Sequence, residues 1–499
     1  MLLAAWSSAA IWFFHRQGAL FGYGDAEAHL NMARRVLDSQ TPGYDMIGRI
    51  WLPLPHLLMM PLARVDSLWH NGLAGAIPSG ACFVAAGLFL FGAARRIFPP
   101  EAAAASLALF ATNPNVLYLQ STAMTEAVFA ACLLALLYFT VRFRQTQGWP
   151  SVVGAGIAAC LGALTRYEGW FVIPFVALYF LVAARKRRLR IAAALFFVLA
   201  VLGPLWWLAH NWWLTGDVLD FYRGSNSALS IQGSVHYPGR GNWREAWVYY
   251  RTAAQLCAGP GLFWAGAAGV AAALMKHAFW PLILLALPGC FYVWSVHSAA
   301  VPIFVPTLWP NTFYNTRYGL AVLPLLALSS GALVALIPER ARKAASLVLI
   351  AGALASWAIL PRAERWVTWR EAEVNSEGRR QWVHEAAEYL QAKYVHGSGV
   401  ITSFGDMTAI FRQMGLPLRE TFTADNGLPW TASVKRPDLF LRQEWAVAMG
   451  GDEVQSAVNR AARYGIRYRM EKMIISGREP VIEIYRRVGG PFGPGTANP

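Results

Sequence analysis

Apolar runs follow one another along most of the chain, and nearly all of them are long enough to cross a membrane. A helix needs about 20 apolar residues to span roughly 30 Å of hydrocarbon. Such runs occupy residues 72–94, 101–117, 119–140, 151–183, 191–209, 253–274, 278–297, 317–337 and 344–361. The run at 151–183 is too long for one helix, so we expect a turn within Leu164–Gly169. With residues 1–15 as a short first segment, the pattern predicts about eleven membrane-spanning helices.

The pattern changes after Pro361 to that of a water-soluble fold. Helical spacing of apolar residues predicts helices over 377–394 and 452–464, and short β-type runs predict strands at 400–404, 445–449 and 480–486. We therefore predict an all-α polytopic membrane domain at residues 1–361, followed by a small soluble α/β domain at residues 362–499.

Three connections between the apolar runs are long, at residues 16–71, 210–252 and 298–316. Long loops in compact proteins often carry function. The first contains an amphipathic pattern that predicts a helix over 25–38, and then an apolar piece at 51–61. That piece is too short and too rich in proline to span, so we expect it at the membrane interface, where tryptophan is favoured.

The distribution of charge supports this division into two parts. Residues 1–361 contain 36 charged side chains, about 10% of that part, whereas residues 362–499 contain 35, about 25%. Soluble proteins carry about 25% charged residues, so only the second part has an ordinary soluble composition. The five cysteines all lie in apolar runs without metal-ligand spacing, which is typical of small core residues. A single soluble domain, a disordered chain and a small secreted module are excluded.

Basic residues cluster between the apolar runs, as in cytoplasmic loops of membrane proteins. The clusters are Arg95–Arg96, Arg142 with Arg144, Arg185–Arg190, and Arg340 with Arg342–Lys343. With Met1 inside, that side collects 13 basic residues against two acids. We expect an integral protein of the plasma (inner) membrane with a cytoplasmic N-terminus and a periplasmic or extracellular C-terminal domain. Residues 1–15 could alternatively be a signal peptide. The net charge of +15 does not indicate a nucleic-acid partner, because it is not gathered on one folded face.

Ionisable residues near membrane depth are costly and usually functional. Asp25 and Glu27 open the predicted first-loop helix, and Glu126 begins a helix after the second outer loop. Each could be only a first-turn carboxylate favoured by the helix dipole. Arg166 and Glu168 could form an ordinary ion pair at a turn.

Arg317 precedes Tyr318 at the start of a span and could reach toward lipid headgroups. Together, however, these residues suggest one chemistry. Carboxylates suit the deprotonation of a hydroxyl nucleophile, and arginine can bind a phosphate through two parallel hydrogen bonds. This combination implies transfer of a group from a lipid phosphate to an alcohol.

The chain contains three further motifs, Gly24–His29, Leu164–Trp170, and Asn315–Gly319 before Leu323–Pro324. These segments resemble the GT-C superfamily of integral-membrane glycosyltransferases that use polyprenyl-phosphate sugars, in particular the protein O-mannosyltransferase and aminoarabinose transferase branch. The resemblance covers roughly residues 16–337.

The resemblance implies that Asp25 is the general base, that the sugar carbon is inverted, and that Arg317 contacts the lipid phosphate. Glu126 would match the family's second acidic position. Many relatives have two adjacent acids in the first loop, whereas here Ala26 separates Asp25 from Glu27. The role of Glu27 and a requirement for a divalent metal therefore stay open.

The sequence thus predicts a glycosyltransferase that moves a sugar from a polyprenyl-phosphate donor to a hydroxyl of a lipid, glycan or protein acceptor, beside membrane lipids. The expected site residues are Asp25, Glu27 and Glu126 for catalysis, Arg317, Arg166 and Tyr318 for the donor phosphate, and Glu168, His56, Asn211 and Arg223 for the pocket. The competing classes are a lipid or sugar transporter or flippase, in which charged residues would trace a path across the membrane, and a membrane anchor without catalysis.

Overall fold

A computed structural model describes residues 1–185, 191–225, 227–233, 235–299, 301–403, 405–477 and 480–489. The chain divides into two compact units. The first comprises Met1–Gly18, Arg49–Pro55 and Ala76–Ala372. The second comprises Ala19–Gly48, His56–Gly75 and Glu373–Pro499, so that two stretches of the first outer loop group with the C-terminal part of the chain.

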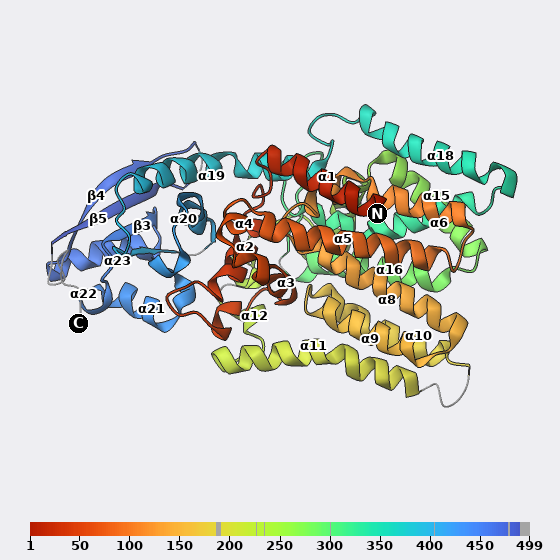
Figure 1. The fold of residues 1–499 in the computed structure, drawn as a ribbon, viewed down its shortest axis with the longest axis horizontal. Helices are drawn as coiled ribbons and strands as arrows, with labels where there is room; N and C mark the ends of the chain where they lie inside the picture. The colour runs from red at the N-terminus through yellow and green to blue at the C-terminus, as the bar shows by residue number, and fades with distance from the viewer. Residues whose placement is uncertain are drawn as a thin grey trace. The chain divides into compact units, whose positions relative to one another are not determined.

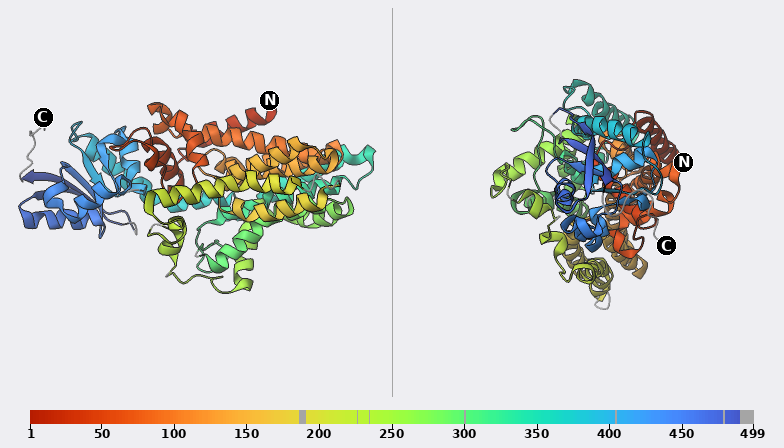
Figure 2. Two further views of the ribbon diagram at one scale, coloured as in Figure 1. Left: turned by 90° about the horizontal axis from the view of Figure 1, so that it is seen from below. Right: turned by 90° about the vertical axis from the view of Figure 1, so that its left-hand side faces the viewer.

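The first unit is a bundle of helices whose long members run side by side (Figures 1 and 2). Its helices are α1 (Leu2–Arg16), α5 (Leu73–Ala94), α6 (Pro100–Ala111), α7 (Pro114–Leu119), α8 (Glu126–Thr146), α9 (Trp149–Ala163), α10 (Glu168–Ala183), α11 (Ile191–Thr215), α12 (Asp220–Arg223), α13 (Ala228–Gln232), α14 (Trp243–Ala258), α15 (Pro260–Met275), α16 (Phe279–Ser298), η3 (Thr316–Val322), α17 (Leu323–Val334), α18 (Glu339–Ala355) and η4 (Ser356–Ile359).

Among the described residues, six helical segments are long and apolar enough to cross a membrane, or seven if a bent pair counts as one span. The six are Leu73–Ala94, Glu126–Thr146, Ile191–Thr215, Phe279–Ser298, Thr316–Val334 and Glu339–Ile359. The bent pair is α14 and α15, which meet at 112°. Shorter apolar helices, α6, α9 and α10 among them, accompany these segments. The chain is therefore an integral membrane protein, while the count of about eleven spans stays a prediction.

The helix boundaries follow the predicted runs, with differences at three of them. The run at 253–274 is divided between α14 and α15. The expected turn within 164–169 separates α9 from α10. The run at 101–117 is instead broken by Asn113, which caps α7 by accepting hydrogen bonds from the amides of Asn115 and Val116. The run at 119–140 begins its helix only at Glu126, because residues 120–125 form a polar loop before it.

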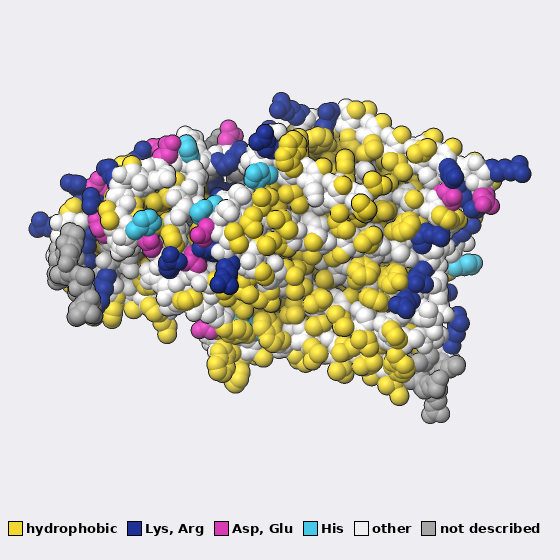
Figure 3. Space-filling view, in the orientation of Figure 1, with side chains coloured by type: hydrophobic (Ala, Val, Ile, Leu, Met, Phe, Trp, Pro, Cys, Tyr) yellow, Lys and Arg dark blue, Asp and Glu magenta, His cyan; other side chains and the backbone are white. Residues whose placement is uncertain are grey.

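Apolar side chains cover most of the visible face of the helical unit (Figure 3), as expected where lipid replaces water. Leu178, Leu202 and Leu205 are each more than half exposed on α10 and α11. Lys and Arg gather at the end of the bundle where α5 and α8 finish and α18 begins. The stretch Lys186–Arg190 of the predicted basic cluster lies outside the described residues.

The second unit contains a five-stranded sheet with the order β2-β1-β3-β5-β4. Strand β1 pairs in parallel with β2 and β3, while β5 is antiparallel to both β3 and β4. The elements of this unit are α2 (Gly24–Arg35), η1 (Tyr44–Ile47), α3 (Leu54–Ala63), α4 (Asp66–His70), most of α19 (Val367–Gln391), β1 (Val400–Thr402), η5 (Gly405–Met407), α20 (Thr408–Met414), η6 (Leu418–Glu420), β2 (Thr421–Phe422), η7 (Ala424–Asn426), α21 (Leu428–Lys435), α22 (Pro437–Phe440), β3 (Trp445–Met449), α23 (Glu453–Ala461), η8 (Ala462–Tyr464), β4 (Arg467–Ile474) and β5 (Ile482–Gly489).

Two apolar cores stabilise this sheet, one on each face. Trp382 and Leu390 of α19 pack with Val447 on one side, and Val454 and Val458 of α23 form part of the other cluster. The predicted strand at 445–449 coincides with β3. The predicted helix at 377–394 overlaps α19, which begins earlier, at Val367, and ends at Gln391. Strand β4 was not predicted, because arginine alternates with other side chains along it and it has no stripe of apolar residues. Phe404, at the end of the predicted strand 400–404, lies outside the described residues.

Candidate functional site

Helix α8, the turn between α9 and α10, α16 and η3 surround a cavity of about 60 Å³ in the helical unit. Polar and apolar side chains both line the cavity. The polar residues are Gln120, Glu126, Arg166, Glu168, Tyr292, Arg317 and Tyr318. The apolar lining includes Phe83, Phe110, Leu119, Phe129, Leu133, Leu320 and Pro324. The cavity therefore combines charged groups with an apolar lining.

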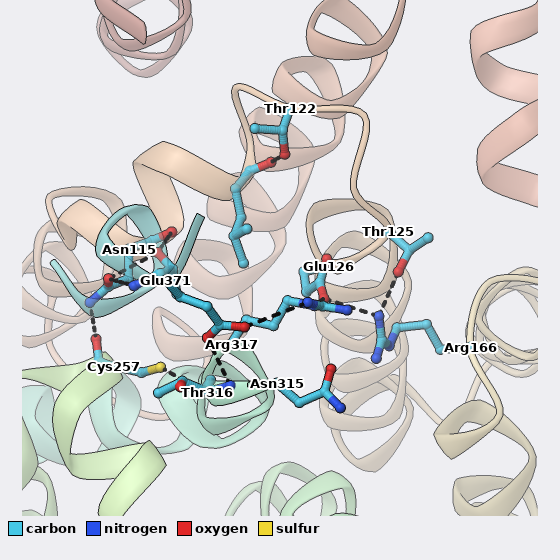
Figure 4. A network of polar contacts seen from close by, with 12 residues as sticks. Asn115, Thr122, Thr125, Glu126, Arg166, Cys257, Asn315, Thr316, Arg317 and Glu371 are labelled. Carbon is cyan, nitrogen blue, oxygen red and sulfur yellow. Dashed lines mark hydrogen bonds and ion pairs between the residues drawn. The ribbon is translucent and has the colours of Figure 1, made fainter. Parts of the chain in front are cut away.

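Glu126 lies between two arginines in this cavity (Figure 4). Its Oε1 atom is 3.2 Å from Arg166 Nη1 and 3.3 Å from Arg317 Nε. Its Oε2 atom is buried and has no hydrogen-bond partner among the described residues. These distances exceed the 2.7–2.9 Å typical of charge-assisted hydrogen bonds. Glu126 thus lies within reach of both guanidinium groups through long contacts.

Arg166 is fixed on its other sides by shorter bonds. Its Nε donates to Glu168 Oε1 at 2.5 Å, and its Nη1 donates to Thr125 Oγ1 at 2.5 Å. Its Nη2 donates to the hydroxyl of Tyr292, which in turn donates to Glu168 Oε1 at 2.7 Å. Arg166 and Glu168 therefore form the ion pair considered for this turn in the sequence, and both side chains line the cavity.

Two glycines allow the backbones that carry these residues to approach their neighbours. A Cβ on Gly319 would clash with the backbone of Ala253 in α14, so only glycine lets η3 lie against that helix. A Cβ on Gly169 would lie 2.6 Å from the carbonyl oxygen of Gly162 at the end of α9. The close turn at Gly169 sets Arg166 and Glu168, and the close packing at Gly319 sets Arg317.

Glu371, near the start of α19, is a site residue that the sequence analysis missed. Its Oε2 accepts a hydrogen bond from the amide of Thr316 at 2.9 Å, and its Oε1 lies 3.8 Å from Arg317 Nη1 (Figure 4). The side chain is 2% exposed. Burial raises the pKa of Glu371 to about 7, although Arg317 and the Thr316 amide oppose the shift. Near neutral pH this carboxyl can therefore be either charged or neutral.

Tyr318 stacks on Tyr292, with ring centroids 4.6 Å apart. Both arginines of the cavity lie over its ring, with Arg166 at 5.4 Å and Arg317 at 5.3 Å from the centroid. A guanidinium over an aromatic face is stabilised without losing its hydrogen-bonding edge. Tyr318 therefore supports both arginines from one side.

Asp25, Glu27 and His56 belong to the second unit. Asp25 lies in the first turn of α2 and is partly exposed. Glu27 is only 2% exposed and accepts hydrogen bonds from Arg412 Nε at 2.7 and 2.9 Å. Its Oε1 also accepts from Asn31 Nδ2 at 3.0 Å. The two acids of the motif therefore have different surroundings, one partly open and one enclosed.

His56 does not face outward. It is 2% exposed, and its Nε2 lies 2.7 Å from Nδ1 of His29 in α2. Burial, together with the neighbouring His29 and Arg35, holds the pKa of His56 well below its ordinary value. This imidazole is neutral at pH 7.

Asn211 and Arg223 do not line the cavity described here. Asn211 is buried in α11 and donates to the carbonyl of Trp207 one turn earlier. Arg223 is exposed and forms a two-bond ion pair with Asp217 at 2.7 Å for each bond. Hydrogen bonding to Arg223 lowers the pKa of Asp217. Both residues were predicted for the pocket, and both form their hydrogen bonds with residues that do not line this cavity.

No group of three or more His, Cys, Asp or Glu side chains is arranged to hold a metal ion within the described ranges. The cavity instead brings two arginines together with two carboxylates, Glu126 and Glu168. Glu371 does not line it and contacts Arg317 instead. Of the residues expected from the sequence, Glu126, Arg166, Glu168, Arg317 and Tyr318 meet in the cavity. Tyr292 was missed because a tyrosine within an apolar run has no distinguishing pattern.

Comparison with known proteins places this geometry in context. A family model described as dolichyl-phosphate-mannose-protein mannosyltransferase matches residues 66–213. No curated protein matches the chain. The solved structure of ArnT from Cupriavidus metallidurans bound to undecaprenyl phosphate is similar over 99% of this chain and 98% of its own, with a TM-score of 0.63 and 14% identity. Its apo state matches with a TM-score of 0.60 and 14% identity, covering 97% of each chain.

The Archaeoglobus fulgidus oligosaccharyltransferase matches more distantly, with a TM-score of 0.46 and 13% identity over 90% of this chain and 68% of its own. The ArnT likeness spans both the helical unit and the C-terminal sheet. The chain therefore has the ArnT fold, and the resemblance to membrane glycosyltransferases of the GT-C superfamily predicted from its sequence is confirmed.

Proposed function

We propose that this protein transfers a sugar from a polyprenyl-phosphate donor to a hydroxyl acceptor, and that the cavity of the helical unit binds the donor. The observation that carries the proposal is the composition of that cavity. Two arginines line it together with many apolar side chains. A lipid phosphate has the matching structure, a charged head followed by hydrocarbon. The ArnT structure bound to undecaprenyl phosphate supports the same assignment by likeness of fold.

In the proposed reaction, Asp25 takes the proton of the acceptor hydroxyl while its oxygen attacks the anomeric carbon. The bond from that carbon to the phosphate oxygen breaks, and the polyprenyl phosphate leaves with the bonding electrons. Arg317 and Arg166 bind the growing negative charge, which stabilises the transition state. A single displacement of this kind inverts the sugar carbon.

The grouping of charge favours an enzyme over the competing transporter. Glu126, Arg166, Glu168 and Arg317 meet at one cavity instead of being spaced along the helices. We further propose that the bundle end rich in Lys and Arg faces the cytoplasm of a plasma (inner) membrane, which leaves the C-terminal domain outside. The basic ends of α5 and α8 and the basic start of α18 support this orientation.

The decisive experiment is a transfer assay with purified protein and a panel of polyprenyl-phosphate sugars, offered with lipid, glycan and protein acceptors. We expect transfer from one donor class, and no measurable transfer by Asp25→Asn, which keeps the side chain's shape and removes its basicity. The anomeric configuration of the product, read by NMR, should be inverted relative to the donor. Full activity in Asp25→Asn would remove that residue from the reaction, and a native protein that consumes no donor in the panel would overturn the proposed function.

A further inference from the structure

Helix α2, which carries Asp25 in its first turn, is bound by an arginine from the C-terminal part of the chain. Arg412 in α20 donates from Nε to both carboxylate oxygens of Glu27. Successive residues of a helix turn by about 100°, so residues two apart face nearly opposite directions. Glu27 therefore faces α20 and is buried, while Asp25 is on the other side of the same turn and is partly exposed.

The same arginine also holds the chain just before this helix. Its guanidinium lies 3.6 Å from the ring centroid of Phe21, three residues before α2 begins. Its Nη1 donates to the carbonyl of His70 at 2.6 Å. Phe21 and Glu27 flank Asp25 in the chain, so Arg412 contacts both sides of the segment that carries this carboxylate.

Further contacts continue along one face of α2. Glu27, Asn31 and Arg35 are spaced by four residues and so lie in a row. Asn31 donates to Thr408 Oγ1 at 2.8 Å and accepts from Trp69 Nε1 at 2.9 Å. Arg35 forms an ion pair with Asp425. The helix is thus fixed along three turns. Its partners Arg412, Thr408 and Asp425 lie more than 370 residues away in the chain, and Trp69 lies 38 residues away.

These partners come from a part of the α/β domain that commonly binds ligands. Thr408 and Arg412 follow β1, and Asp425 follows β2, which is parallel to β1. In open α/β sheets the crevice at the carboxyl ends of parallel strands is the usual ligand position. Here the residues after those ends bind α2.

We propose that the C-terminal domain fixes the position of α2, and that Arg412 is a positioning residue that sets the orientation of Asp25. The inference rests on the proposed function, in which Asp25 is the general base. A displacement of about 1 Å in a reacting group can lower a rate on the order of a hundredfold. Loss of the Arg412 contacts frees both sides of Asp25, so the effect falls on the chemical step and leaves donor binding unchanged.

The test uses the full-length protein with Arg412→Met, which keeps the apolar stem and removes the guanidinium. Glu27→Gln removes the charge of the partner, and the double variant asks whether the two residues act through one contact. Arg436→Met is the matched control, because Arg436 pairs with Asp438 on the exposed surface of the same domain. If Arg412→Met does not fold, Arg412→Lys replaces it in the same measurements. The readouts are kcat, the donor KM, and hydrogen exchange of the amides in Gly24–Leu30.

We expect Arg412→Met to lower kcat by about tenfold to a hundredfold, with the donor KM within threefold of the native value. Glu27→Gln should show a similar loss and the double variant no further loss, since residues that act as a unit are not additive. Amides of Gly24–Leu30 should exchange at least about tenfold faster than in the native protein and in Arg436→Met.

If the amides of Gly24–Leu30 exchange at the native rate in Arg412→Met, the proposal that Arg412 fixes α2 is overturned. Faster exchange with native kcat, in a protein that Asp25→Asn inactivates, overturns the positioning role. A raised donor KM with unchanged kcat does the same. A native protein without transferase activity, whose α2 amides still exchange faster in Arg412→Met, would reject the proposed function while supporting the role of Arg412 in fixing α2.

Discussion

Two arginine–carboxylate clusters in this protein are built from the same residue types but differ in how completely their bonds are satisfied. In the helical unit, Glu126 lies 3.2 and 3.3 Å from two arginines and keeps one buried oxygen without a hydrogen-bond partner among the described residues. In the second unit, both oxygens of Glu27 accept from Arg412 at 2.7 and 2.9 Å.

This difference separates binding from support. A charged group with long contacts can exchange one partner for a ligand at little cost, whereas breaking a short, buried pair leaves an uncompensated charge. The Glu126 cluster also borders the cavity in which we propose that the donor phosphate binds. We therefore read the first cluster as a binding site and the second as a clamp, although the sequence alone ranks their acids alike.

The largest effect should come from removing Arg317, which would most directly test the binding side of this comparison. Loss of a donor aimed at developing charge typically costs on the order of 10²–10³ in rate, and we expect such a loss in kcat/KM for the lipid donor in Arg317→Ala. Arg317→Lys should recover part of it, because a lysine keeps the charge but not the paired geometry. Steady-state kinetics with varied donor concentration make the measurement.

Arg240→Ala is the matched control, since Arg240 is exposed and donates only to the carbonyl of Val235 among the bonds seen. We expect native kinetics in that variant. Native donor kinetics in Arg317→Ala would instead mean that Arg317 only anchors its helix.

A smaller effect, on stability, should follow from Asp38→Asn in the second unit. Asp38 is 6% exposed and accepts from Arg34 Nε at 2.8 Å and from the amide of Leu418 at 3.2 Å. Leaving such buried donors unmet costs about 1–3 kcal/mol, and Asp66 still pairs with Arg34 in the variant. Limited proteolysis with increasing temperature should show earlier cleavage in the second unit.

All five cysteines lie in the helical unit. The reactivity of their thiols therefore reports on that unit alone and should be unchanged in Asp38→Asn. Equal acceleration of thiol labelling and proteolysis would show that this network stabilises the whole chain.

The sequence predicted those features that depend on local pattern. Run length predicted most of the long helices, and the Leu164–Gly169 segment predicted the turn that presents Arg166. Glu126, Arg166 and Arg317 were identified because charge is rare among apolar runs, and the structure brings their side chains together.

Partnerships between distant segments could not be predicted in this way. Arg412 and Glu27 are separated by 385 residues, and Arg412 lies in a segment of ordinary soluble composition where an arginine attracts no attention. Glu371 was missed for a similar reason. The expected helix begins at residue 377, so this acid lies before every element predicted for the C-terminal domain, whereas α19 starts at Val367.

A several-fold effect that depends on pH should come from Glu371→Gln. Burial raises the pKa of Glu371 to about 7, so the native carboxyl gains its charge between about pH 6 and pH 8. That negative charge next to Arg317 opposes the binding of a phosphate. The sugar phosphodiester keeps one negative charge throughout this range, so its own ionisation adds nothing. We expect the donor KM to rise by about threefold to tenfold from pH 6 to pH 8.

In Glu371→Gln the donor KM should be nearly flat over this range and close to the native value at pH 6. The amide can still accept from the Thr316 nitrogen, so the loop is retained. A native pH profile in the variant would assign the titration to another group, and a KM that falls with rising pH would reverse the assumed electrostatic role.

The smallest effect is expected at Arg223, which the sequence places at the rim of the pocket and the structure places in an exposed pair with Asp217. The side chain of Arg223 is 60% exposed. Exposed pairs contribute little because water screens them and the side chains lose freedom. Arg223→Ala should therefore keep kcat and the donor KM within about twofold of native values, well inside the range of a surface change. A loss beyond tenfold in kcat/KM for the acceptor, with donor kinetics intact, would contradict this expectation. It would show that Arg223 leaves Asp217 and contacts the acceptor. Exposed ion pairs that open on binding would then also count as binding groups, beside the cluster around Glu126.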